Sequence, residues 1–183
     1  MLNGVTTVVA DSQNESPMAD YPTVPAGDVL DMDLELLGTN LDPSSNQIFT
    51  SKYASIYYVN EDDLNDFIWR LGGAKLEFTD NPEMASHRLD RLVNRVQMIL
   101  DMWPTNFAIR IHLYRGDLKF DKFAYYNEDE NTIYVHVDYN SDGVMAHELA
   151  HAVINHYFPT PPPSKVQEIL AQYVDRNLWS DYY

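Results

Sequence analysis

The sequence predicts an α+β fold, in which a small mixed sheet packs against amphipathic helices. Three segments, 53–59, 107–114 and 132–137, are rich in the aromatic and β-branched residues that favour strands. Other segments repeat apolar residues at helical spacing, and the longest of them ends before Pro104. The chain has 183 residues, 45% of them hydrophobic and 13% aromatic, which is typical of one globular domain with a core.

The first part of the chain differs in composition from the rest. Residues 1–50 are polar, acidic and rich in Pro, Ser and Asn, and only 29–37 is apolar enough to suggest an element. We therefore expect an acidic, partly ordered N-terminal extension over 1–50. The ordered domain is expected over 51–183.

Strand 53–59 precedes two predicted helices. Asn60 is suited to cap the first helix, because acidic residues follow it, and Gly72 and Gly73 end that helix. Asn81 and Pro82 open the second helix, which closes before Pro104. Its apolar stripe consists of Leu89, Leu92, Val93, Val96, Ile99, Leu100 and Trp103. We expect the sheet to pack against this helix.

The second half of the chain is predicted to contain two strands and two helices. Segment 107–114 alternates with period two, and a polar turn at 127–131 precedes strand 132–137. A helix over 144–157 is broken by the proline loop 158–163, and Ser164 and Gln167 have the spacing of a capping box for the last helix. The predicted packing face of that helix consists of Val166, Ile169, Leu170, Tyr173 and Val174.

Charge and residue usage exclude several function classes. Twelve Lys and Arg stand against 28 Asp and Glu, a formal charge of -16, so nucleic acid is not expected as a partner. The ordinary interpretation of this acidity is a solvated surface. Since the chain has no cysteine, a metal ion must be bound by His, Asp or Glu.

No segment indicates a membrane span or a signal peptide. No apolar run approaches the roughly 20 residues that cross a bilayer, and residues 1–10 lack the basic region of a signal peptide. Two locations agree with this: the cytoplasm, or a secreted or periplasmic location if an export signal has been removed.

The strongest functional signal is an HExxH motif at 147–151. Its spacing brings His147 and His151 to one face of a helix, where both imidazoles can reach one metal ion. The alternative is a helix with two incidental histidines. Glu168 on the following helix can approach the same ion in a helical hairpin. Two imidazoles and one carboxylate leave a fourth position for water, as in hydrolytic zinc sites.

Other candidates for the third ligand fit less well. The metzincin pattern requires Gly at 154 and His at 157, whereas the chain has Ile154 and Tyr157. His156 is one residue out of that register, and we interpret it as a packing or supporting residue. Asp175 is a weaker competitor of Glu168, or a support for a ligating histidine.

Two short segments resemble a known enzyme family. Residues 146–153 (AHELAHAV) and 168–173 (EILAQY) are similar to the HELAH and EGLAEY segments of peptidase MA-like gluzincins, and the resemblance covers roughly 51–180. It implies a minimal zincin-like, thermolysin-like catalytic domain in which His147, His151 and Glu168 bind Zn²⁺. The resemblance also implies that Glu148 is the general base that activates water. Peptides or proteins would be the substrates.

The chain departs from this family at several points. Ile169 stands where Gly is usual and Gln172 where Glu is usual. Only 169–183 follow Glu168, so the C-terminal subdomain that lines part of the cleft in larger gluzincins is expected to be missing. The resemblance also implies a peptide-binding edge strand before the HExxH helix, for which 133–137 is the counterpart. An ordinary buried strand is the alternative there.

The sequence thus predicts a zinc metallopeptidase and leaves two alternative functions open. A catalytically degenerate zincin-fold protein would bind metal or peptide only, and a latent enzyme would have its cleft filled by 1–50 or 181–183. Tyr157, Tyr173 and His156 are the candidate donors to the tetrahedral oxyanion. Substrate, cleavage preference and oligomeric state are not predicted.

Overall fold

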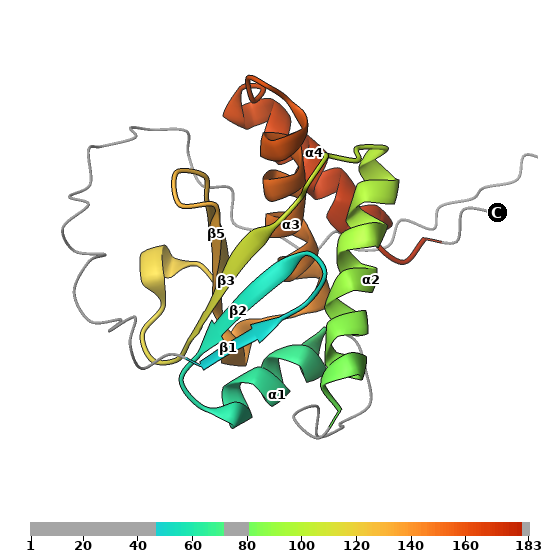
Figure 1. The fold of residues 1–183 in the computed structure, drawn as a ribbon. Coiled ribbons are helices and arrows are strands. Elements are labelled where there is room, and N and C mark those ends of the chain that lie inside the picture. The colour runs from blue at the N-terminus through green and yellow to red at the C-terminus, as the bar shows by residue number, and fades with distance from the viewer. Residues whose placement is uncertain (1–46, 72–80, 181–183) are drawn as a thin grey trace, which may run out of the picture. The chain divides into compact units, whose positions relative to one another are not determined.

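The structure, a computed structural model, describes residues 47–71 and 81–180. It confirms the α+β class, with a five-stranded mixed sheet and four α-helices in these residues (Figure 1). Some predicted features lie outside the described residues, namely the apolar segment 29–37, the helix end at Gly72 and Gly73, and the C-terminal segment 181–183. The elements are β1 (Gln47–Thr50), β2 (Ala54–Tyr58), α1 (Glu61–Arg70), α2 (Pro82–Leu100), β3 (Ile109–Tyr114), η2 (Lys119–Asp121), β4 (Ala124–Asn127), β5 (Thr132–His136), η3 (Val137–Tyr139), α3 (Asp142–Tyr157) and α4 (Ser164–Asn177).

The sheet has the strand order β1-β2-β3-β5-β4. The three predicted strands are β2, β3 and β5, which run parallel in its centre, and β1 and β4 are antiparallel edge strands. Both edge strands were missed in the sequence, because four residues are too few to show an alternating pattern. One of them, β1, lies within the segment assigned to the N-terminal extension.

The counterpart of a peptide-binding edge strand is not at 133–137. Strand β5 pairs with β3 on one side and with β4 on the other, and Ile133 and Val135 are fully buried. That expectation from the resemblance is therefore wrong, and the alternative of a buried strand is correct. The edge on this side of the sheet is β4.

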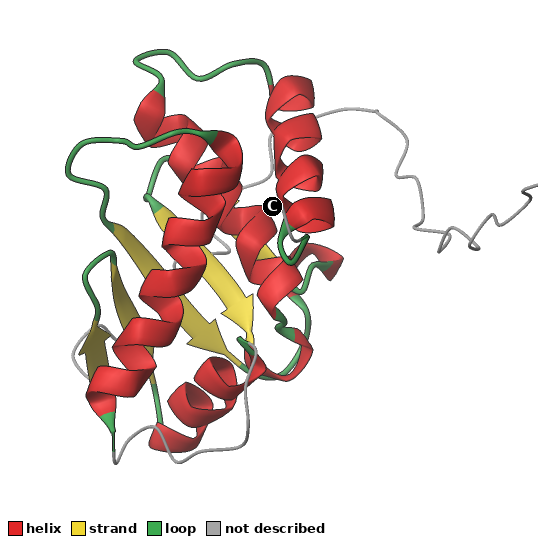
Figure 2. Cartoon of the chain, turned by 90° about the vertical axis from the view of Figure 1, so that its right-hand side faces the viewer, coloured by secondary structure: helices red, strands yellow, loops and turns green. Residues whose placement is uncertain are grey.

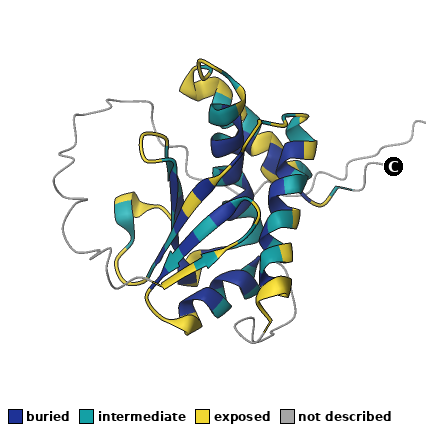
Figure 3. Cartoon of the chain, in the orientation of Figure 1, coloured by how far each residue is buried: buried dark blue, intermediate teal, exposed yellow. Residues whose placement is uncertain are grey.

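The core lies between one face of the sheet and the helices. Ile56, Ile111 and Ile133 are neighbours in register on β2, β3 and β5, and each is 0% exposed. Figure 2 shows α2 lying across the sheet, and Figure 3 shows the buried residues gathered on the inner sides of the helices and central strands. Burying each such side chain stabilises the fold by roughly 1.5–3 kcal/mol.

The helix ends follow the predicted capping residues in the first two helices. Asn60 accepts a hydrogen bond from Asp63 N–H and Asn81 accepts one from Met84 N–H. Helix α2 ends at Leu100, because Asp101 adopts a left-handed conformation with φ of 51°. Trp103 therefore lies outside the helix and is 54% exposed, so its place in the apolar stripe was predicted wrongly.

The last helix differs from its prediction in two respects. Its N-cap is Pro163, with no side-chain capping bond, so the capping box is wrong. Its buried residues are Ala171 and Val174, whereas Val166, Ile169 and Tyr173 are 43–58% exposed. Val174 was therefore predicted correctly, and the small Ala171 takes the buried place expected for larger apolar side chains such as Ile169. No helix in the described segments has the length and apolar character needed to cross a bilayer.

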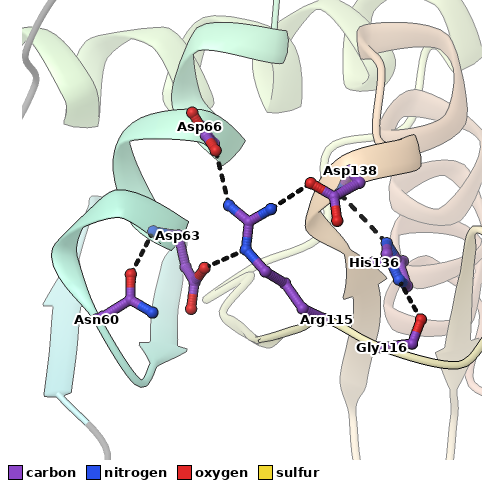
Figure 4. Close-up of polar contacts among 7 residues, drawn as sticks. All are labelled: Asn60, Asp63, Asp66, Arg115, Gly116, His136 and Asp138. Carbon is purple, nitrogen blue, oxygen red and sulfur yellow. Dashed lines mark hydrogen bonds and ion pairs between the residues drawn. The ribbon is translucent and has the colours of Figure 1, made fainter.

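One arginine joins three acidic side chains at the end of the sheet (Figure 4). Arg115 follows β3 and binds Asp63 and Asp66 of α1, at 2.6 Å each, and Asp138 of η3. Asp138 N–H donates to His136 Nδ1, so His136 Nε2–H donates to the Gly116 carbonyl at 2.9 Å. This network holds α1 and η3 to the end of β3, and η3 leads into α3.

We expect Arg115→Met to lower the free energy of unfolding by about 1–3 kcal/mol at neutral pH, because it leaves the buried Asp63 carboxylate beside two other acids without a cation. Urea unfolding measures this change. Arg91→Met, at an exposed position of α2, is the control and should change little. Adding Asp63→Asn to the Arg115→Met protein should restore part of the loss. An Arg115→Met protein as stable as the wild type would contradict the role of the network.

Candidate metal centre

Helix α3 positions the two histidines of the HExxH motif by burying its opposite face. Ser141 caps the helix by accepting a hydrogen bond from Val144 N–H. Met145, Leu149 and Val153 are 0% exposed in the core. The side chains of His147 and His151 are therefore on the accessible face, at 24% and 19% exposure.

The hairpin of α3 and α4 brings Glu168 to these histidines. Glu168 Oε2 lies 3.5 Å from His147 Nε2 and 3.6 Å from His151 Nε2. Donor atoms at the corners of a tetrahedron, each about 2.0–2.2 Å from a zinc ion, are roughly 3.3–3.6 Å apart. The two carboxylate–imidazole separations lie within this range, and the three residues form a group that could hold a metal.

Gln167 orients one of the histidines. Its Oε1 is 3.4 Å from His151 Nδ1 and accepts a hydrogen bond from Asn155 Nδ2 at 3.0 Å, while its Nε2 donates to the Pro162 carbonyl. An Nδ1–H that points at this amide oxygen leaves the lone pair of Nε2 free for a metal. No sequence pattern indicated this role, and Gln167 was interpreted as a capping residue.

Gln172 orients the carboxylate of the group. Its Nε2 donates to Glu168 Oε1 at 2.9 Å, which leaves Oε2 directed at the histidines. Burial raises the pKa of Glu168, but the bond from Gln172 and the two histidines outweigh it, so the pKa is lowered overall. The amide of Gln172 thus favours the ionised form of Glu168, which is the form that binds metal.

Glu148 lies beside the group and is held by the edge strand. Its Oε2 accepts a hydrogen bond from Tyr126 N–H of β4 at 2.8 Å. Burial raises the pKa of Glu148 to about 7, although Tyr126 N–H and Lys122 act in the opposite direction. A carboxylate with this pKa can both accept and return a proton near neutral pH. Burial, and then His147, lower the pKa of His151, which favours the neutral imidazole that binds metal.

The remaining candidate residues lie outside this group of three. His156 Nδ1 is bonded to the Ala152 carbonyl at 2.8 Å, and its ring packs edge-on against Phe107. Asp175 approaches the first turn of α3, where a Cβ on Gly143 would be 2.7 Å from its Oδ1, so a larger residue at 143 would displace it. The side chains of Tyr157 and Tyr173 are about half exposed, at 45% and 46%. The oxyanion role of Tyr157, Tyr173 or His156 stays a prediction.

Comparisons with protein-family models, curated proteins and solved structures find no match to this chain. The function of the site has to be inferred from its own residues.

In the metal-free protein, Glu148 should make stability depend on pH. Its pKa in the folded state, about 7, is above the ordinary value of 4.5, so the folded state holds this proton more tightly than the unfolded state does. The associated stability is complete below pH 4.5 and decreases as the pH rises towards 7. Relative to Glu148→Gln, the wild type should lose up to roughly 3 kcal/mol across this range.

Urea unfolding of both proteins with a chelator, at pH 4.5 and at pH 8, measures this difference. Asp129→Asn, in the exposed turn after β4, is a control that should follow the wild type at both pH values. A difference between wild type and Glu148→Gln that stays constant with pH would contradict the raised pKa.

Proposed function

We propose that the protein is a zinc-dependent peptidase, in which His147, His151 and Glu168 bind the metal and Glu148 is the general base. The observation that carries the proposal is the position of Glu168 Oε2, 3.5 and 3.6 Å from the two imidazole nitrogens, with a proton acceptor of pKa about 7 beside them. The sheet, the HExxH helix and the following glutamate helix also agree with a minimal zincin-like domain.

The chain supplies binding, orientation and proton transfer. Zinc held there would act as a Lewis acid towards a peptide carbonyl and would increase the acidity of water. Tyr126 N–H fixes one oxygen of Glu148, and the carboxylate takes the proton of the attacking water. Glu148 then returns this proton to the amine that leaves. Gln167 and Gln172 keep the ligating atoms of His151 and Glu168 directed at one point.

A peptide substrate fits the edge of the sheet at β4. The Phe123 carbonyl accepts from His136 N–H, so the backbone groups of Phe123, Tyr125 and Asn127 face β5. Those of Ala124 and Tyr126 face the other way, where Tyr126 N–H reaches Glu148. An extended peptide that pairs with this edge would lie beside the proposed general base. Strand β4 would thus take the role that the family resemblance implied for 133–137.

Glu148→Gln should keep the metal and lose hydrolysis. The amide cannot accept the proton of water, so the rate on a peptide library should fall roughly 10²–10⁴-fold. Metal analysis should give equal zinc content in both proteins. Equal hydrolysis by wild type and variant would contradict the proposal. Bound zinc without hydrolysis in the wild type would instead favour a metal- or peptide-binding protein.

Glu168→Gln should lose metal and activity together. The variant removes the only charged ligand of the group, so zinc affinity should fall by at least the roughly 10–100-fold typical of losing a supporting residue. The rise in melting temperature on adding zinc should shrink in parallel. Glu83→Gln, the same change at an exposed position on α2, is the control. Unchanged zinc affinity in Glu168→Gln would exclude it as a ligand.

A further inference from the structure

A pocket of about 390 Å³ lies at the C-terminal end of the edge strand. Its lining consists of Tyr126, Glu128, Asn131, Asn155, His156 and Pro161. Two of these residues also contact the metal centre. Tyr126 N–H binds Glu148, and Asn155 Nδ2 binds the His151 carbonyl and Gln167. A peptide beside Glu148 that continues along β4 would enter this pocket.

The pocket presents hydrogen-bond acceptors and a negative charge. The exposed Glu128 lines the pocket together with Tyr126, whose pKa burial, and then the charge of Glu128, raise to about 12. His156 Nδ1 must carry a hydrogen, because its partner, the Ala152 carbonyl, can only accept. His156 Nε2 is then an acceptor when the ring is neutral. A carboxylate and an imidazole acceptor suit a cationic side chain that donates hydrogen bonds.

The opposite end of the edge strand carries a positive charge. Lys122 is extended, with φ of -115° and ψ of 143°, and it precedes Ala124 and Tyr126 by two and four residues. The ammonium group also lowers the pKa of both Glu148 and His151, which indicates that its charge acts on the centre. Strand β4, Ala124–Asn127, lies between Lys122 and Glu128 in the chain, so the two charged residues flank the outward-facing backbone of this edge.

We propose that this edge selects peptides by charge. A lysine or arginine side chain on the N-terminal side of the scissile bond enters the pocket of Glu128, and an aspartate or glutamate side chain on the C-terminal side lies near Lys122. This inference rests on the proposed peptidase function. Because Glu128 follows β4 in the chain and Lys122 precedes it, a peptide with this charge order runs antiparallel to β4. Antiparallel pairing is also slightly more stable per residue than parallel pairing.

Peptide binding tests the inference without hydrolysis. The probe is a set of acetylated and amidated decapeptides, in which lysine or norleucine is placed along the N-terminal half and glutamate or glutamine along the C-terminal half. Binding to the Glu148→Gln protein, incubated with zinc, is measured by calorimetry. We expect lysine and glutamate each to tighten binding by roughly 2–5-fold, as for exposed ion pairs. The preferred lysine position should lie nearer the N-terminus than the preferred glutamate position.

Matched variants assign each preference to its residue. Glu128→Gln should remove the preference for lysine, and Lys122→Gln should remove the preference for glutamate. Asp129→Asn and Lys165→Gln, at exposed positions nearby and on α4, should retain both preferences. The double variant Glu128→Lys with Lys122→Glu should prefer peptides with the reversed charge order. Because all four positions are exposed, equal melting temperatures are expected and should be checked.

The outcomes separate this inference from the proposed function. A parent protein without charge preference, or a lysine preference that survives Glu128→Gln, overturns the charge selection. Hydrolysis of the best-bound peptide by the wild type with zinc is measured separately. Charge-dependent binding without hydrolysis would support the selection and contradict the peptidase. Hydrolysis without any charge preference would support the peptidase and contradict the charge selection.

Discussion

The arrangement of the candidate site depends on the burial of one face of α3. Met145, Leu149 and Val153 are 0% exposed between the sheet and the other helices. A rotation of α3 that exposed them would lose several kcal/mol of hydrophobic stabilisation, since each side chain contributes roughly 1.5–3 kcal/mol. The same constraint directs His147 and His151 outwards. The helix is also anchored at its beginning, because η3 before it is held by Arg115.

Helix α4 is held at both ends, and this places Glu168. At its start, Gln167 binds the Pro162 carbonyl and contacts His151. At its end, Arg95 of α2 donates to the Leu178 and Ser180 carbonyls at 2.8 Å, and the Trp179 indole donates to Asp142 at the start of α3. These contacts fix the hairpin without a metal. The donor atoms can therefore converge before an ion binds, which reduces the ordering that binding requires.

The sequence predicted the parts of the fold whose patterns are local. The central strands have aromatic and β-branched runs of five or six residues, and Asn60 and Asn81 cap their helices as their sequence positions indicate. Strand β4 could not be predicted in this way, because it has only four residues and owes its place to pairing with β5. The predicted face of α4 was correct at Val174 and wrong at Ile169, which is 58% exposed, because packing on α3 selected the small Ala171 instead.

The same distinction applies to the candidate site. The spacing of His147 and His151 is a local property of a helix, so the sequence shows it directly. The contact of Tyr126 N–H with Glu148 joins residues 22 positions apart, through a strand that the sequence did not reveal. The spacing of Gln167 from Ser164 suggested a capping residue, whereas its contact with His151 depends on the hairpin of α3 and α4. The side chains that orient the ligands could therefore not be identified from the sequence.

Glu148 is the residue at which stability and the proposed function oppose each other. The burial that raises its pKa to about 7 makes its charged form unfavourable in the folded protein, and Tyr126 N–H offsets only part of this effect. An isolated structural role would favour an apolar or amide side chain at this position, because neither has an ionised form to bury. A general base, in contrast, requires a carboxylate that is close to half-protonated at the working pH. The unfavourable burial of Glu148 is thus easier to explain by proton transfer than by packing, which connects the electrostatics of the site to the proposed peptidase.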